Sequence, residues 1–265
     1  MRKALLLGIG FLFVCGVALA DSQKPQGYLD AASAPDTTVI LPHAPVKGTA
    51  RYEADRKIFL RTRKLNGSAR WQMAVNDDDY FDPAVAKDFT CALGVTINPT
   101  DEPHLTALIT RMGADLGRAG RDAKNFNKRK RPFLIDKGKT CVAITPAFAK
   151  SFDYPSGHST YSWGLGLVLA EIAPDRATQV LARARAYGES RVVCGVHNAS
   201  AVDAGRTEAS IVIAALHSSA EFRADLDAAR TELAAARAKA TPPANCDAEN
   251  ALVAQDEPGP ERKRD

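Results

Sequence analysis

The stretch SRVVCGVH at residues 190–197 decides how the rest of the chain is interpreted. Two earlier segments carry groups of the same kind, KNFNKRKRP at residues 124–132 and PSGH at residues 155–158. Together the segments hold three fixed cations, two imidazoles and a Ser-Gly helix start, without a cluster of carboxylates to bind a metal. This set suits a phosphate monoester dianion, because cations can bind its oxygens while one His attacks phosphorus and the other protonates the leaving group.

The first twenty residues have the pattern of an export signal. Arg2 and Lys3 precede an apolar run over residues 4–17, and Ala18-Leu19-Ala20 forms a small-residue cleavage site before Asp21. We therefore predict a signal peptide over residues 1–20 and a periplasmic or secreted protein of 265 − 20 = 245 residues. The apolar run is too short for a good membrane span.

The charge of the mature chain is close to balanced. Removing Arg2 and Lys3 leaves 35 − 2 = 33 basic residues against 31 acidic ones, a net charge of +2. Bulk charge therefore does not indicate a nucleic-acid partner. The basic run Lys128-Arg129-Lys130 is interpreted as a solvated helix face.

Apolar residues at spacings of three and four predict a single all-α domain. The predicted parts are an extended N-terminal arm over 21–50 with a short strand at 37–41, a helical domain over 51–240 and a tail over 241–265 that is disordered apart from whatever Cys246 anchors. Helices are predicted within the domain at 52–65, 68–76, 82–93, 105–124, 157–172, 174–188, 197–216 and 220–239, with a loop at 133–154.

The three segments, in this order and spacing, resemble the signature of the type 2 phosphatidic acid phosphatase superfamily, and within it the secreted bacterial class A non-specific acid phosphatases. The likeness runs from Tyr28 to Lys239. It implies a helical bundle of the acid phosphatase/vanadium haloperoxidase type and no metal or other cofactor. It also implies that His197 is a nucleophile forming a phosphohistidine and that His158 protonates the leaving alkoxide. The phosphate-binding residues that it implies are Lys124, Arg131, Ser156, Gly157 and Arg191.

The chain departs from this signature after the nucleophile. The family motif continues His-x3-Asp, with a carboxylate that orients the imidazole, whereas position 201 here is Ala201. The aromatic residue that usually follows the His is replaced by Asn198. Asp203 is a weak candidate substitute, because on a regular helix it lies about 120° around the axis from His197. Spoiling the orienting carboxylate of a Ser-His-Asp triad costs about 10⁴ in rate, so slow turnover is one expectation.

Four cysteines remain after the signal peptide, an even number in an oxidising compartment. Three connectivities are open, and spacing does not choose among them. We expect Cys141–Cys194, because both lie in segments around the site, and Cys91–Cys246, which would hold the tail on the domain.

The resulting interpretation is a periplasmic, metal-independent acid phosphatase acting on small phosphomonoesters, with phosphate or vanadate as inhibitors. One alternative is a catalytically reduced relative that binds phosphate or phosphoesters. A vanadium haloperoxidase is a further alternative, since that class shares the fold and the anion site. Neither a nucleic-acid partner nor a membrane span is expected, and a homo-oligomer stays open.

Overall fold

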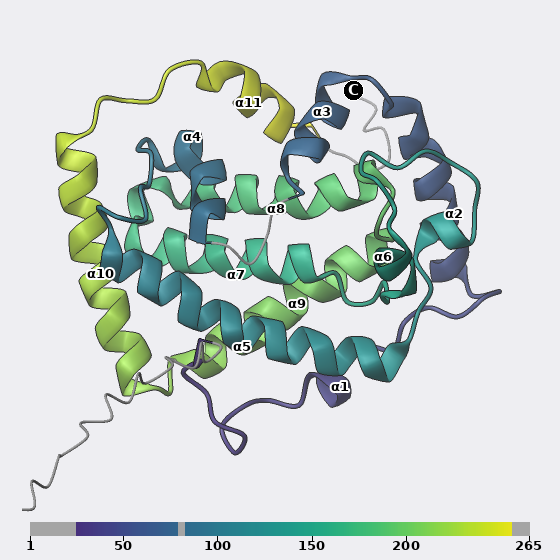
Figure 1. Ribbon diagram of the computed structural model, residues 1–265, viewed down its shortest axis with the longest axis horizontal. Helices are drawn as coiled ribbons and strands as arrows, with labels where there is room; N and C mark the ends of the chain where they lie inside the picture. The colour runs from purple at the N-terminus through teal and green to yellow at the C-terminus, as the bar shows by residue number, and fades with distance from the viewer. Residues whose placement is uncertain (1–24, 79–82, 256–265) are drawn as a thin grey trace, which may run out of the picture.

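The structure is a computed structural model that describes residues 25–78 and 83–255. Within these ranges all regular elements are helical, which confirms the predicted all-α fold (Figure 1). Short 3₁₀ turns lie at 63–65, 83–89, 132–134 and 174–176. The helices are α1 (Thr37–Ile40), α2 (Ala50–Thr62), α3 (Ala69–Asn76), α4 (Thr90–Leu93), α5 (Pro103–Asn127), α6 (Pro146–Lys150), α7 (Gly157–Ile172), α8 (Ala177–Cys194), α9 (Ala199–Leu216), α10 (Ala220–Lys239) and α11 (Cys246–Val253).

Helix α7 lies at the centre of the bundle. It is apolar on most sides, as a fully surrounded helix must be, and its most extensive packing is against α8 and α9. Figure 1 shows α7 and α8 running alongside each other across the middle of the molecule. A side chain at Gly166 would place its Cβ 2.5 Å from the Cβ of Ala184, so this glycine is what allows the two helices to approach so closely.

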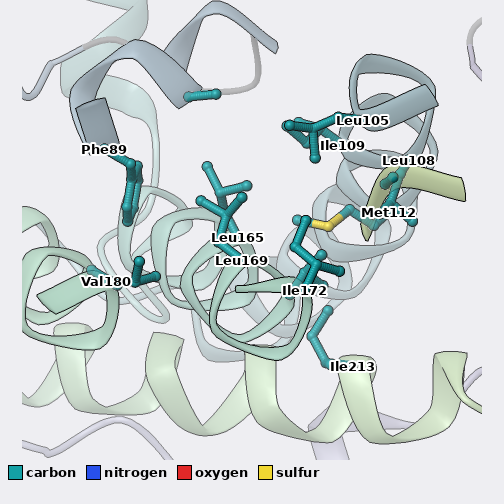
Figure 2. Close-up of a cluster of buried hydrophobic side chains, with 14 of the residues drawn as sticks. Phe89, Leu105, Leu108, Ile109, Met112, Leu165, Leu169, Ile172, Val180 and Ile213 are labelled. Atoms are coloured by element: carbon teal, nitrogen blue, oxygen red, sulfur yellow. The ribbon is translucent and has the colours of Figure 1, made fainter. Parts of the chain in front are cut away.

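The amphipathic helix α5 supplies a second wall of the core. Its predicted apolar stripe is buried against α7 and α10. Figure 2 shows side chains of this stripe facing those of α7, with Phe89, Val180 and Ile213 completing the cluster. Fully burying one such side chain stabilises the fold by about 1.5–3 kcal/mol. The cluster therefore fixes α7, whose first residues carry the PSGH motif.

Several predicted elements differ in the structure. The strand expected at 37–41 is instead the helical turn α1, capped by Asp36, whose carboxylate accepts a hydrogen bond of 2.9 Å from the N–H of Thr38. The expected loop at 133–154 contains α6. Asp82, the predicted helix cap, and the predicted signal peptide lie outside the described residues.

The tail is ordered as far as the structure describes it beyond residue 241. Residues 246–253 form α11, with Val253 buried, and this is the part of the tail that Cys246 was expected to anchor. The disulfide Cys91–Cys246 holds the start of α11, and Glu249 pairs with Arg183 of α8 at 3.1 Å. These long-range contacts explain why local composition did not reveal the helix.

Both predicted disulfides are present. Cys91 pairs with Cys246, and Cys141 pairs with Cys194 at the end of α8. Among the helices that the structure describes, none has the length and hydropathy needed to cross a membrane.

Candidate active site

The three motif segments meet around two buried imidazoles. The ring centroids of His158 and His197 are 6.4 Å apart. The guanidinium Nη1 of Arg131 lies 3.1 Å from Nε2 of His197. Arg191 is fully buried and lies in the same motif segment as His197. The structure therefore brings together the residues that the sequence singled out.

The end of α8 places Arg191 and His197 next to each other. Gly195 ends the helix in the left-handed conformation, with φ +79°, where a side chain would be strained. The chain then turns back, and the N–H groups of Val196 and His197 donate to the carbonyl of Arg191 at 3.1 and 3.2 Å. This closure of the helix end is of the kind that satisfies otherwise unpaired terminal carbonyls. Arg191 and His197, six residues apart in the sequence, therefore lie next to each other.

The second segment positions Arg131. Helix α5 ends at Asn127 with Lys128 as its cap, and Arg131 is extended because Pro132 follows it. Its guanidinium donates to the carbonyl of Val196 at 2.9 Å and lies 4.2 Å from the ring centroid of Phe148. These contacts hold the planar fork beside His197, where it can bind phosphate oxygens.

The PSGH segment forms the start of α7. Ser156 caps this helix by accepting from the N–H of Ser159, and its own N–H donates to the carbonyl of Ala201 at 2.9 Å. The amides of Gly157 and His158 fall in the first turn, whose N–H groups lack partners within the helix and favour an anion. Helix α9 can pack here only through Gly205, where a Cβ would lie 2.6 Å from the carbonyl oxygen of Ser156.

Lys124 lies behind this turn rather than at its surface. Its ammonium donates to the carbonyl of Phe152 at 3.1 Å and to the carbonyl of Pro155. Burial, followed by the charge of Arg131, lowers the pKa of Lys124 to about 7. A bound phosphate would favour the charged form, because an opposite charge nearby raises the pKa of an ammonium.

Asp78 supplies the site with a negative group from the chain itself. Its Oδ1 lies 2.6 Å from Nη1 of Arg191, and its backbone oxygen accepts a bond of 2.8 Å from Nε2 of His158. The Asp78 side chain is 45% exposed, whereas Arg191 is fully buried. The carboxylate therefore contacts Arg191 in the way that a phosphate oxygen would, and it does so at the solvent side of the site.

Both imidazoles are held neutral by their surroundings. Burial is the main cause that lowers the pKa of each ring well below the usual range. Further lowering comes from Arg191 for His158 and from Arg131 for His197. A neutral His197 is the form that can attack, whereas His158 requires a proton to act as an acid.

A residue that the sequence analysis missed contacts His197. Asp153 is fully buried, and its Oδ1 lies 3.0 Å from Nδ1 of His197. Its carboxylate also accepts from the backbone N–H and the side-chain amide of Asn198, at 3.1 and 2.8 Å. The one available signal was an acidic residue inside the apolar approach to the PSGH motif, in FDYPSGH.

The candidate substitute Asp203 has a different environment. Its side chain is 61% exposed and pairs with Arg206 at 3.4 Å. Helix α9 begins at Ala199, so His197 precedes the helix and the predicted angles around one regular helix do not apply. Ala201 is buried with Tyr154 and Ala204. The carboxylate beside Nδ1 of His197 is thus that of Asp153, and the expectation for Asp203 is corrected.

The interpretation of Arg129 as part of a solvated face is also wrong. Arg129 is 8% exposed, and its Nη2 donates to Asp55 of α2 at 2.8 Å. Its Nη1 donates to Ser200 at 2.7 Å, and Nε lies 3.6 Å from Oδ2 of Asp153. The backbone N–H of Asp153 donates to the carbonyl of Arg129 at 2.9 Å. Arg129 therefore belongs to a buried charge network behind His197.

Glu208 of α9 is a further buried acid below the site. Its carboxylate accepts from Thr160 of α7 at 2.9 Å and from Thr37 of α1 at 3.3 Å. Burial raises the pKa of Glu208 from 4.5 to about 7. The folded protein therefore keeps this proton at pH values where the unfolded chain has lost it.

Replacing Glu208 by Gln is expected to remove a pH-dependent loss of stability. Between pH 4.5 and 7 the unfolded chain binds fewer protons at this group, so the stability that it contributes at acid pH is lost as pH rises. The shift corresponds to roughly 3–4 kcal/mol. Denaturant unfolding of both proteins across this range checks it: the free energy of unfolding of the wild type should fall relative to Glu208→Gln. If the free energies of unfolding of the two proteins changed with pH in parallel, the expectation would be contradicted.

Comparison with known proteins places the chain in a family. Residues 105–224 match the model of the PAP2 superfamily. The chain is 37% identical over 247 residues to an acid phosphatase of Zymomonas mobilis, covering 87% of this chain and 93% of that protein. It is 37% identical over 209 residues to a non-specific acid phosphatase of Providencia stuartii, covering 78% and 84%. A non-specific acid phosphatase of Salmonella typhimurium is 35% identical over 198 residues, covering 73% and 78%. With its three motif segments meeting in one buried site, the chain belongs to the PAP2 superfamily.

Proposed function

We propose that the protein is a metal-independent acid phosphatase that hydrolyses small phosphomonoesters through a phosphohistidine on His197. The observation that carries this proposal is the pair of contacts on that ring. Nδ1 faces a carboxylate at 3.0 Å, while Nε2 faces the guanidinium of Arg131 at 3.1 Å. A nucleophilic lone pair therefore lies directly beside a cation that can hold the phosphoryl group.

In the first step Nε2 of His197 attacks phosphorus and the bond to the leaving oxygen breaks. Charge in this loose transition state spreads over the equatorial oxygens, which Arg131, Arg191 and the first-turn amides of α7 can stabilise. His158 donates its Nε2 proton to the leaving oxygen. The bound dianion supplies the negative charge that favours protonated His158, whose pKa burial otherwise lowers.

In the second step water attacks phosphorus and the P–N bond of the phosphohistidine breaks. His158 accepts the proton from water, since it gave up its own proton in the first step. Inorganic phosphate leaves, and His197 is neutral again. The relatives named above are described as acid phosphatases, two of them as non-specific, which supports small phosphomonoesters of varied leaving group as the substrate class.

We also propose export to the periplasm, with loss of residues 1–20. The supporting observations are the signal-like N-terminal pattern and the two disulfides, which persist in oxidising compartments.

The test is turnover of p-nitrophenyl phosphate and of an alkyl phosphate by the purified mature protein. His197→Ala is expected to abolish turnover of both and to abolish the base-stable, acid-labile phosphoenzyme that rapid quenching traps in the wild type. His158→Ala should slow the alkyl ester far more than the aryl ester, because p-nitrophenolate leaves without protonation. Turnover that survives His197→Ala would overturn the proposal. Vanadate binding without any turnover by the wild type would favour the phosphate-binding alternative.

A further inference from the structure

We infer that Asp153 is the carboxylate that positions His197 for attack, in the role that the family motif gives to an aspartate at position 201. The inference rests on the proposed function, because it takes His197 to be the nucleophile. It concerns a residue that acts through His197 rather than on the substrate. Its consequence is that Ala201 does not by itself imply slow turnover.

Two independent contacts fix the same tautomer of His197. A carboxylate oxygen of Asp153 lies 3.0 Å from Nδ1, so the proton is placed on Nδ1. A guanidinium only donates hydrogen bonds, so Arg131, at 3.1 Å from Nε2, requires a lone pair on Nε2. The nitrogen that faces Arg131 is therefore the one that can attack, and Asp153 can stabilise the positive ring that forms after phosphoryl transfer.

Asp153 is itself held on several sides. Asn198 donates to Oδ1 through its backbone N–H and to Oδ2 through its side-chain amide, at 3.1 and 2.8 Å. The charge of Arg129, whose Nε lies 3.6 Å from Oδ2, counteracts the rise in the pKa of Asp153 that burial causes. Arg129 is anchored in turn by Asp55 at 2.8 Å. Such supporting contacts give an orienting group a single direction.

The same geometry accounts for both departures from the family signature. Ala201 carries no acceptor and packs in an apolar cluster with Tyr154 and Ala204. Asn198 stands where the motif has an aromatic residue, and its amide is one of the donors to Asp153. In this chain the carboxylate beside Nδ1 of His197 therefore comes from the loop before PSGH, and Asn198 donates to it.

The decisive variant is Asp153→Asn, which keeps the shape but can present an N–H to Nδ1 and so favour the wrong tautomer. We expect kcat for p-nitrophenyl phosphate to fall by about 10³- to 10⁴-fold. The rate of phosphoenzyme formation in a single turnover should fall with it, while inhibition by vanadate stays close to that of the wild type. In ¹⁵N-histidine-labelled protein, the signal of His197 should lose the pure Nδ1–H state.

Asp115→Asn is the matched control. Asp115 is also a buried carboxylate, 2% exposed, but it accepts from the N–H of Tyr28 at 2.6 Å and pairs with Arg118 at 2.8 Å, outside the proposed site. This variant should lose stability while kcat and the His197 signal stay unchanged. The comparison separates a positioning role from the general cost of altering a buried acid.

Ala201→Asp in the wild-type background provides a second test. Because Nδ1 already has a carboxylate partner, we expect no gain in kcat. A clear gain would overturn the inference, as would Asp153→Asn with wild-type kcat and an unchanged tautomer. Either result, with His197→Ala still inactive, would leave the proposed function standing. Activity in His197→Ala would instead remove the proposed function itself.

Discussion

Replacing Arg191 by Ala is expected to lower kcat/KM for a phosphomonoester by about 10³-fold. Arg191 is fully buried at the end of α8, on the same corner as His197. Its planar fork would bind two phosphate oxygens at once, and such charge-assisted pairs are among the strongest in proteins. Inhibition by vanadate should weaken in the same variant. Arg191→Lys should fall in between, because it keeps the charge but not the two-pronged geometry.

The control is another buried arginine of the same helix. Arg183 is 4% exposed and pairs with Asp77 at 2.6 Å. Arg183→Ala should destabilise the fold, yet the folded protein should keep its kcat/KM and its vanadate inhibition. If Arg191→Ala retained wild-type vanadate inhibition, the phosphate site would have to be placed elsewhere.

Removing the disulfide Cys141–Cys194 by double substitution with Ala is expected to lower stability by about 4 kcal/mol. The bridge links positions 53 residues apart, and the loss follows from the added freedom of the unfolded chain. We also expect kcat to fall, because the bridge holds the end of α8, which positions the proposed site. Cys194 is the last residue of α8, and its carbonyl accepts from the N–H of Cys141 at 3.0 Å. Denaturant unfolding and p-nitrophenyl phosphate turnover measure the two effects.

The second disulfide is the comparison for this prediction. Cys91–Cys246 closes a longer loop, 155 residues, but anchors α11. Its removal should lower the free energy of unfolding by a similar or larger amount, while kcat stays close to that of the wild type. Equal losses of kcat in both double variants would mean that the effect is a general loosening of the fold rather than one on the site.

Helices set by local periodicity could be predicted from the sequence. The bounds expected for 157–172 and 220–239 coincide with α7 and α10, because caps, apolar spacing and the following breaks all lie within each segment. The helix α11 could not be predicted in this way, since a disulfide and an ion pair to distant residues hold it. The helix predicted to begin at His197 begins instead at Ala199, because the chain turns back at Gly195 after α8 ends.

The named site residues came from motifs that resemble a family signature, whereas their supporting groups lie outside those motifs. Asp153 is 44 residues from His197 in sequence, and Arg129 is 74 residues from Asp55. Nothing local separates Arg129 from the basic residues around it, and only the fold shows that it is buried. Sequence patterns therefore gave the groups expected to touch substrate, and the structure was needed for the groups that orient them.

The pair between Asp78 and Arg191 has a consequence for how ligands exchange. In the proposed mechanism, a phosphate that binds at Arg191 would compete with a carboxylate already 2.6 Å from the guanidinium, so its affinity would reflect the difference between two anions rather than the full attraction. The same exchange works in reverse when product leaves, because Asp78 can restore a partner to a fully buried charge. Turnover by the proposed mechanism would then include an exchange of two anions at Arg191, with the protein supplying one of them.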